Sequence, residues 1–572
     1  MIEELKQFTP NFIADEYSKE ESRNLAPFFT NLERSVYAPL IFSPELIGAL
    51  CSRTSRATRD LRHIYLNEFI NPFLSPERRE KDTDKLWKEK VAYGKELKVF
   101  IDFLQKHPLL EIFSNPRARS FYITWLAQYG DDSIAQMAGM HLGFAALSQV
   151  AIKHYEDQRI GLAPIEKSTR YVDYREKVGG HYLYYTDPTL HDLGLYEEYE
   201  RVMDNLFHTY TLLIPKLTTW LAQRFPQEKA SVVEKKAFDT LRGLLPNSTL
   251  SQVAFFGNGQ AFEYMISRSR NHSLGEIRWG AAAAEEELDK VGPSFFRRLK
   301  DEEKTGLVEE YQEYLAGRGK RVAPLIKEFL SDDKKSALRA AKESGVELLE
   351  FDPEGEEKVI TGMLYAGSNN HLSWQEILDR VKKMNSYEKR KIIDAYMQGR
   401  TKRFQKVGRA FENTYVRFEI VMNIGAWRDL QRHRMLTQQR QNFSCHHGYD
   451  VPQEIIESGL ETEFRSALDP VSDLFEKIVK HNNDLAQYAT TMAHRLRFMQ
   501  WENLRQSFWQ IELRSIPEGH PDYRHIVQKK FYAIEKAYPL LAERMLVNLG
   551  EYDFARRGQD ERIQKKLTQL QN

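Results

Sequence analysis

The sequence predicts a protein of at least two domains, rich in long helices with a few strands, in which the second half repeats the first. Three observations support this prediction. The chain has 572 residues, which is too long for a single hydrophobic core of ordinary size. Its long amphipathic segments contain few Gly or Pro residues. The same order of patterns occurs twice along the chain, and an internal duplication explains this order most simply.

Each half begins with a segment whose apolar residues recur at helical spacing. Residues 134–154 and 409–434 are therefore each predicted to form an amphipathic helix that leads into a polar, basic loop. Further along, residues 249–270 and 494–514 are each predicted to form a strand, then an asparagine, then a helix. The repeated order predicts that each half adopts the same fold.

A charged region separates the halves, and a short strand is predicted directly after it at residues 346–351 (VELLEF). The predicted organisation is an N-terminal extension, a first repeat, a charged helical linker and a second repeat, at residues 1–34, 35–300, 301–345 and 346–560.

Charge and cysteine content exclude several classes of protein. Lys plus Arg and Asp plus Glu both number 82, so no overall positive field favours nucleic acid as a partner. Only Cys51 and Cys445 are present, which excludes a disulfide framework and a cysteine-rich metal site, and we expect no bound metal. No apolar run is long enough to cross a membrane and no leader is evident, so we expect a cytoplasmic protein without a membrane partner.

A polar stripe is predicted on the helix that follows Asn503. Asn503, Ser507, Gln510 and Arg514 share one side of that helix. Such a stripe ending in Arg suits an oriented anionic ligand. Alternatively, Asn503 only caps the helix and the stripe faces water.

Two basic motifs suit phosphate groups. Arg432-His433-Arg434 offers guanidinium donors and an imidazole that can change charge near neutral pH, although an exposed, ion-paired helix end explains it equally well. Ser168 and Arg170 lie in the segment IEKSTRY, where a hydroxyl, a guanidinium and backbone N–H groups suit a mononucleotide phosphate. An ordinary turn with a surface ion pair is the alternative there.

Taken together, these motifs resemble the flavin-dependent thymidylate synthases, whose signature is Arg-His-Arg, seven residues, then Ser-x-Arg. The resemblance covers both repeats. It implies an α+β fold in which the long helices of each repeat pack on a twisted antiparallel sheet. It also implies an enzyme that binds FAD and methylates dUMP to dTMP with methylenetetrahydrofolate and NADPH, at sites formed between the subunits of a tetramer.

In the second repeat the resemblance implies the flavin side of the site. The matching residues for FAD are Arg432, His433, Arg434, Asn503 and Arg505, while Arg514 matches the arginine that activates the uracil and Gln431 is placed with the substrate. The same repeat has Asn442, Phe443 and Ser444 in place of Ser-x-Arg, and Gln487 in place of a nucleotide-binding Arg.

In the first repeat the resemblance implies the nucleotide side. The matching residues are Glu166, Lys167, Ser168, Thr169 and Arg170 for the dUMP phosphate, Arg242 for the same phosphate, and Arg268 (or Arg270) for the uracil. The Arg-His-Arg place reads Gln158-Arg159-Ile160, and Gln260 replaces the Arg of Asn-x-Arg.

These complementary losses suggest that each repeat gave up the half-site that it no longer needs. A composite site would then join Arg432–Arg434 and Asn503 of one repeat to Ser168 and Arg170 of the other, in a homodimer that replaces the tetramer. The alternatives are a degenerate relative that binds flavin or pyrimidine nucleotide without making thymidylate, a related flavin-dependent pyrimidine modification, and a non-enzymatic helical scaffold or RNA-binding protein.

Overall fold

The chain folds into two compact units, and each is described by itself below. Unit 1 comprises Met1–Leu212, Leu245–Asp333 and Glu476–Ala489, and unit 2 comprises Leu213–Leu244, Lys334–Phe475 and Thr490–Asn572. The computed structural model describes residues 3–41, 43–79, 82–112, 115–122, 132–158, 160–300, 306–330, 343–367, 371–554 and 566.

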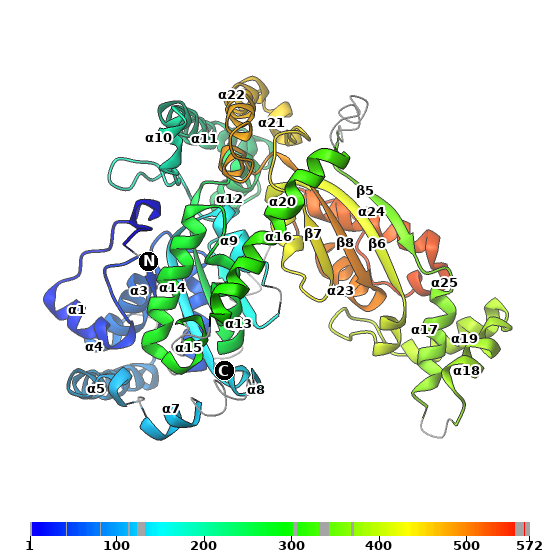
Figure 1. The fold of residues 1–572 in the computed structure, drawn as a ribbon, viewed down its shortest axis with the longest axis horizontal. Helices are drawn as coiled ribbons and strands as arrows, with labels where there is room; N and C mark the ends of the chain where they lie inside the picture. Colours follow the sequence, from blue (N-terminus) through cyan, green and yellow to red (C-terminus); the bar gives the residue numbers. More distant parts are fainter. Residues whose placement is uncertain are drawn as a thin grey trace. The chain divides into compact units, whose positions relative to one another are not determined.

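Unit 1 contains an antiparallel four-stranded sheet in the order β1-β2-β4-β3. Its strands belong to the blue-to-green part of the chain in Figure 1. Its strands are β1 (Val36–Tyr37), β2 (Gly139–Ser148), β3 (Leu162–Glu166) and β4 (Leu250–Asn258). Both faces of the sheet are covered by helices. Phe144 of β2 stacks on Tyr155 of helix α9, whereas the next residue, Ala145, belongs to a cluster with Leu50 and other side chains of the N-terminal helices.

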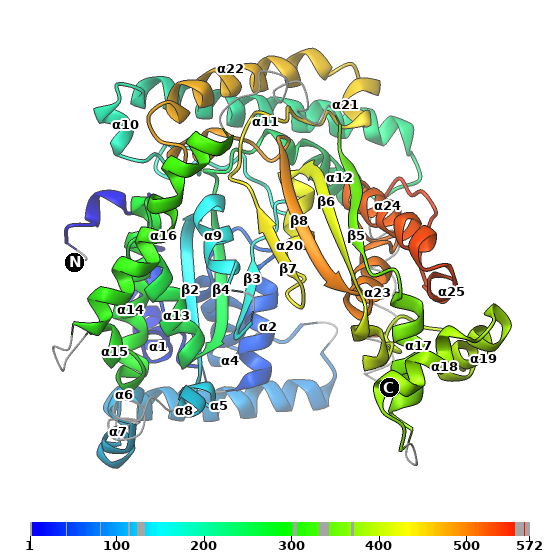
Figure 2. The same ribbon diagram turned by 45° about the vertical axis from the view of Figure 1, so that its right-hand side comes forward.

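The helices of unit 1 begin at polar caps. Ser148 accepts the N–H of Ala151 at the start of α9, and Asn258 accepts the N–H of Ala261 at the start of α13. These helices and α14 pack on the sheet (Figure 2). The α-helices with their bounds are α1 (Lys19–Leu25), α2 (Pro44–Thr54), α3 (Leu61–Ile64), α4 (Asn71–Leu74), α5 (Asp84–Lys106), α6 (Leu109–Ile112), α7 (Pro116–Tyr122), α8 (Asp132–Gln136), α9 (Gln149–Glu156), α10 (Thr189–Asp192), α13 (Gly259–Ser269), α14 (Gly275–Val291), α15 (Arg297–Lys300) and α16 (Leu307–Leu330).

Unit 2 contains a sheet of the same topology, in the order β5-β6-β8-β7. Its strands are β5 (Gly345–Phe351), β6 (Tyr415–Asn423), β7 (Thr437–Arg440) and β8 (Arg495–Asn503). One face packs against α24 with mostly apolar side chains and a buried ion pair between Glu502 and Lys530, while the other carries ion pairs such as Arg417–Glu350 at 2.9 Å. The shared strand order confirms the predicted α+β fold of two similar repeats.

The helices of unit 2 repeat the capping pattern of unit 1. Asn423 accepts the N–H of Ala426 at the start of α20, and Asn503 accepts the N–H of Gln506 at the start of α23. The α-helices are α12 (Ala230–Leu241), α17 (Gly355–Tyr365), α18 (Trp374–Lys382), α19 (Ser386–Met397), α20 (Ile424–Gln431), α21 (Gln453–Glu457), α23 (Leu504–Arg514), α24 (Pro521–Ala537) and α25 (Pro539–Ala542).

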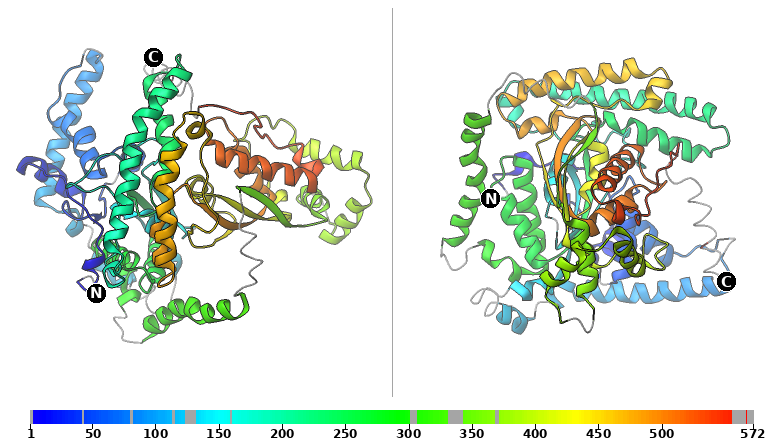
Figure 3. Two further views of the ribbon diagram at one scale, coloured as in Figure 1. Left: turned by 90° about the horizontal axis from the view of Figure 1, so that it is seen from above. Right: turned by 90° about the vertical axis from the view of Figure 1, so that its right-hand side faces the viewer.

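Each unit contains a segment from the other repeat. Helix α11 (Tyr196–Arg224) begins in unit 1 and ends in unit 2, and helix α22 (Glu461–Val479) begins in unit 2 and ends in unit 1. In Figure 3 the colour bar identifies α11 as a teal helix and α22 as an orange one. Within unit 1, Lys477 of α22 pairs with Glu198 of α11 at 2.7 Å. The linear repeats of the sequence are therefore not identical to the compact units.

The long helices predicted at residues 134–154 and 409–434 are wrong in their first parts. The structure has the end of helix α8 and then strand β2 in the first range, and a short 3-10 helix (Arg409–Asn413) and then strand β6 in the second. The α-helices that lead into the loops, α9 and α20, have only eight residues each. In β6 the fully buried residues Val416, Phe418 and Ile420 alternate with more exposed ones. This period of two belongs to a strand, and pairing with β8 fixes it.

Two other elements agree with the sequence. The strand predicted at residues 346–351 is β5, and a helix, α16, occupies residues 307–330 of the predicted charged linker. No helix in the described part of the chain is long and apolar enough to span a bilayer.

Candidate functional site

The polar stripe of the second repeat lies at the junction of β8 and α23. Asn503 caps α23 through the N–H of Gln506 at 2.9 Å, as the alternative interpretation held. The stripe does not face water, however, because Ser507 and Gln510 are fully buried. Ser507 donates its hydroxyl to Glu502 at 2.7 Å, and Lys530 donates to Gln510. The inner part of the stripe is therefore a structural polar network.

The end of the stripe meets the Arg-His-Arg motif. Helix α20 ends at Gln431, which is buried, and the next three residues turn in different directions: Arg432 is exposed, His433 is buried and Arg434 is partly buried. The Nε–H of Arg514 donates to Nε2 of His433 at 3.0 Å, and the amide nitrogen of Gln506 lies 3.2 Å from Nδ1.

Burial and the neighbouring positive charges favour the neutral form of His433. Burial, and next the positive charge of Arg514, hold the pKa of His433 well below its ordinary value. The prediction that this imidazole changes its charge near neutral pH is therefore wrong. Asp429 lies 3.5 Å from Arg514 and 3.7 Å from Arg432, so one carboxylate serves both guanidinium groups.

A cationic pocket of about 560 Å³ opens beside this cluster, in unit 2. It is lined by Arg400, Lys406, Val407, Arg409, Glu412, Met435, Asn503, Arg505, Gln506, Phe508, Trp509 and Glu512. Its four cationic side chains outnumber its two carboxylates. Two of the residues predicted to bind the cofactor, Asn503 and Arg505, are among the lining residues. The side chains of the Arg-His-Arg motif are not, although the next residue, Met435, is.

Ion pairs and aromatic rings order the wall of the cationic pocket. Arg505 pairs with Glu412 at 2.5 Å, and the Lys406 ammonium lies 4.4 Å from the ring centre of Trp509. Burial lowers the pKa of Lys406. The Trp509 side chain is nearly half exposed, so its ring is open to a planar partner. Sequence reasoning missed Arg400, Lys406 and Arg409, because their segment carries no motif of its own.

The same face of the first repeat is filled by the chain itself. Helix α13 corresponds to α23, and a Cβ added to its first residue, Gly259, would meet the Phe295 ring at 2.9 Å. One turn later Glu263 pairs with Arg298 at 2.5 Å, and Gln260 accepts from Gln136 at 2.9 Å. Side chains of unit 1 thus occupy positions that correspond to the lining of the cationic pocket in unit 2.

Equivalent positions in the two repeats are found by counting from the asparagine that caps α13 or α23. The eleventh residue after Asn503 is Arg514, and the eleventh after Asn258 is Ser269. The predicted match of Arg268 or Arg270 to Arg514 is therefore displaced by one residue. Arg268 instead donates to the carbonyl oxygen of Asp157 at 3.3 Å.

Counting from the helix caps also changes which residues of the first repeat correspond to the Arg-His-Arg motif. The tenth residue after the cap Asn423 is His433, and the tenth after Ser148 is Gln158. The place of the motif is thus 157–159, one residue earlier than predicted, and its last residue, Arg159, lies outside the described residues.

The predicted phosphate loop lies in unit 1 and is partly buried. The N–H of Arg170 donates to the Ser168 hydroxyl at 3.2 Å, so the segment is a turn. Thr169 and Arg170 are buried, which does not fit the alternative of a surface ion pair. Glu166 is buried as well and pairs with Lys153 at 2.8 Å.

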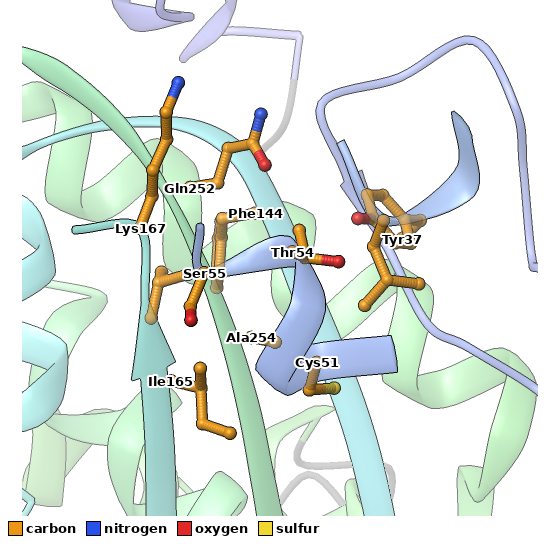
Figure 4. A pocket seen from close by; sticks show the side chains of 11 residues that line it. Tyr37, Cys51, Thr54, Ser55, Phe144, Ile165, Lys167, Gln252 and Ala254 are labelled. Carbon is orange, nitrogen blue, oxygen red and sulfur yellow. The ribbon is translucent and has the colours of Figure 1, made fainter. Parts of the chain in front are cut away.

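Lys167 extends beside Gln252, and both donate to the carbonyl oxygen of Thr58, at 3.3 and 3.4 Å (Figure 4). Burial lowers the pKa of Lys167 to about 8. The cavity at this point measures only about 10 Å³, which is the space of one water molecule. Cys51 lines it too, and burial raises the pKa of its thiol to about 11, so it is not a nucleophile at neutral pH.

Arg242 belongs to the first repeat in sequence but to unit 2 in space. Its side chain is almost fully buried, and it lines a pocket of about 800 Å³ together with Arg495, His520 and Asp450. This pocket lies where β8 begins, and the cationic pocket lies where β8 ends, at Asn503. A strand of nine residues spans roughly 27 Å, so the two pockets are separate.

Comparison with known proteins supports the duplicated fold. Fold and site define a duplicated α+β protein whose second unit holds a cationic pocket at a strand–helix junction. Residues 88–294 and 347–540 each match the family described as thymidylate synthase complementing protein. The chain belongs to this family, and the double match confirms the tandem duplication.

Similar full-length relatives are known. UPF0159 proteins of Chlamydia pneumoniae and Chlamydia muridarum are 33% and 31% identical, covering 92% and 96% of this chain and 94% and 98% of the relatives. A UPF0159 protein of Thermoplasma acidophilum is 29% identical over 77% of this chain and 91% of its own. The solved UMP/dUMP methylase PolB from Streptomyces cacaoi, bound with 5-Br dUMP, aligns with 36% of this chain and 95% of its own, at 14% identity and a TM-score of 0.28, too low to carry an argument.

Proposed function

We propose that the protein is a flavin-dependent enzyme of the thymidylate synthase type. It would transfer the one-carbon unit of methylenetetrahydrofolate to C5 of dUMP in place of the C5 hydrogen. NADPH would provide the hydride, and the products would be dTMP, tetrahydrofolate and NADP⁺. The observation that carries this proposal is the cationic pocket beside the Arg514–His433 cluster, in a repeat that matches the family.

The donor set of the cationic pocket fits FAD. A dinucleotide carries two phosphates and planar rings. The pocket offers the exposed ring of Trp509 and four cationic side chains, of which Arg400 pairs with Glu512, and Arg409 and Arg505 share Glu412. Its volume of about 560 Å³ lies in the range of small-molecule sites. Asn503 and Arg505 would hold the cofactor there, and Arg432 and Arg434 come just before Met435, which lines the same pocket. When bound, the flavin supplies hydride transfer.

Arg514 would act on the uracil. Its guanidinium stays protonated, so it cannot remove a proton, but it stabilises negative charge that develops at the edge of the ring. The hydrogen bond to His433 at 3.0 Å fixes the guanidinium in advance. Preorganised charge of this kind lowers the barrier more than a mobile side chain does. With Ser269 at the equivalent place of the first repeat, Arg514 is the better candidate than Arg268.

The substrate phosphate would be held by Ser168, Arg170 and Arg242. Ser168 and Arg170 belong to unit 1 and Arg242 to unit 2, as do Arg432 and Arg434. We keep the composite site as a proposal in which a homodimer brings these groups together. Separate Arg170→Ala and Arg434→Ala variants test it, because both must weaken dUMP or FAD binding at one shared site. Effects on two unrelated sites would exclude it.

The enzymatic proposal is tested with the purified protein. We expect flavin absorbance after reconstitution with FAD, a change of that spectrum on titration with dUMP, and NADPH oxidation that depends on dUMP. Arg505→Ala should weaken FAD binding about 10-fold or more, since a charge-assisted contact is lost. Arg417→Ala is the matched control, because Arg417 pairs with Glu350 outside the cationic pocket. Absence of FAD binding in the wild-type protein, or equal effects of the two variants, would contradict the proposal.

A further inference from the structure

The imidazole of His433 connects two parts of the proposed site without lining the cationic pocket. Its Nε2 accepts from Arg514, and its Nδ1 faces the amide of Gln506, which does line that pocket. The side chain is only 8% exposed. His433 is therefore placed to act on Arg514 and Gln506, and not on a ligand directly.

A neutral imidazole has a specific advantage as the partner of Arg514. A carboxylate at hydrogen-bond distance would fix the guanidinium but would also neutralise its charge. The carboxylate of Asp429 accepts only a long hydrogen bond from Nη1 of Arg514, at 3.5 Å, and divides its charge with Arg432 at 3.7 Å. Neutral Nε2 accepts the Nε–H and leaves the positive charge of Arg514 available to a substrate.

The two repeats differ at both positions of the His433–Arg514 pair. At the place of His433 the first repeat has Gln158, and at the place of Arg514 it has Ser269. Both amide atoms of Gln158 are buried without a hydrogen-bond partner among the described residues, and Ser269 instead contacts His154 at 2.9 Å. The first repeat thus has neither the imidazole nor the arginine, whereas the second has both. A structural imidazole alone would not explain this joint difference.

We propose that His433 is a positioning residue that holds the guanidinium of Arg514 toward the substrate, and that it does not contact the flavin. This inference rests on the proposed function and departs from the role that the Arg-His-Arg motif implies. Orientation comes mainly from the short hydrogen bond of the Arg514 Nε–H to His433, because the second one, from Nη1 to Asp429, is long at 3.5 Å. Loss of the bond to His433 leaves Arg514 charged but less firmly oriented, and effective catalysis requires a fixed geometry.

Kinetics of three variants test the proposal. His433→Phe keeps the ring volume but removes the acceptor, and we expect kcat to fall about 10- to 100-fold with KM for dUMP and affinity for FAD changed less than about 3-fold. His433→Gln retains an acceptor and should recover part of the loss. When Arg514 is already replaced by Ala, adding His433→Phe should lower kcat by less than about a further 2-fold. A purely structural role would lower the activity of both backgrounds equally.

Imidazole NMR on selectively labelled protein tests the geometry without activity. The charged groups that face the ring are Arg514, Lys530 and Lys406, which lower its pKa, and Asp429, which raises it. We expect His433 to be neutral at neutral pH, with its proton on Nδ1 because Nε2 accepts, and with the Gln506 side-chain amide turned so that its oxygen accepts that proton. Arg514→Ala should abolish this tautomer preference.

The outcomes separate two kinds of failure. Unaltered His433 signals in the Arg514→Ala protein, or unaltered kcat in His433→Phe, would overturn the positioning role. A wild-type protein with no dUMP-dependent NADPH oxidation contradicts the proposed function instead, and the imidazole spectra still decide whether His433 holds Arg514.

Discussion

Replacing Glu276 by glutamine should remove a pH dependence of stability from unit 1. The Glu276 carboxyl is fully buried and accepts from the Ser148 N–H at 2.7 Å, the Ser148 hydroxyl at 2.6 Å and the Tyr488 hydroxyl at 2.7 Å. Burial is the largest influence and raises the pKa of Glu276 to about 7, although these hydrogen bonds act in the opposite direction.

The direction of the effect follows from proton linkage. An unfolded glutamate ionises near its ordinary pKa of about 4.5, so between that value and about 7 the folded protein binds a proton that the unfolded chain has lost. The free energy of unfolding therefore decreases as the pH rises through this window. A difference of roughly 2.5 pKa units corresponds to about 3 kcal/mol, lost in full above roughly pH 8.

The side-chain amide that Glu276→Gln introduces does not ionise, so the stability of the variant should not decrease as the pH rises through this window. It should be less stable than the wild type at about pH 5, by about 1–2 kcal/mol, because an NH₂ group replaces one acceptor oxygen. The difference should shrink or reverse at about pH 8.5. Denaturant unfolding at both pH values, together with hydrogen exchange of the Ser148 N–H, measures this. Glu89→Gln, on the exposed side of α5, is the control. An equal pH slope for the Glu276→Gln variant and the wild type would refute the reasoning.

Three further predictions concern buried charge, helix caps and cofactor stoichiometry. Lys530→Met should lower the free energy of unfolding by about 3–5 kcal/mol, because the buried carboxylate of Glu502, 2.8 Å away, loses its partner. An added Glu502→Gln should restore part of this stability, as denaturant melts will measure. Asn503→Ala and Asn258→Ala should each cost about 1 kcal/mol as lost helix caps, but only the former should weaken FAD binding, as titration will measure. Reconstituted protein should bind one FAD per chain, since the matching face of the first repeat is filled, and a ratio of two by absorbance would contradict this.

The sequence predicted the elements with strong local signals. Asn258 and Asn503 precede helices as expected, because a side-chain oxygen that accepts from the third N–H is a local requirement. Strands β2 and β6 were predicted as helices, since apolar residues of a strand buried by tertiary packing also fit a helical spacing. Their burial depends on partner strands about 80 to 110 residues away, which no local pattern contains.

The site was predictable in its motifs but not in its surroundings. The pairing of His433 with Arg514 joins residues 81 positions apart. The cationic wall formed by Arg400, Lys406 and Arg409 precedes β6 in a segment of ordinary composition. The spatial transfer of Arg242 into unit 2 depends on the path of helix α11. Each of these features arises from long-range packing.

The exchange of segments between the units has a consequence for biosynthesis. Glu276 receives the hydroxyl of Tyr488, which follows it by 212 residues. While the ribosome is still translating the second repeat, unit 1 has its sheet but lacks Glu476–Ala489, and a buried carboxyl lacks one of its donors. Unit 1 therefore matures only after most of the polypeptide has emerged, and a gene cut between the repeats would yield two incomplete products that must find each other.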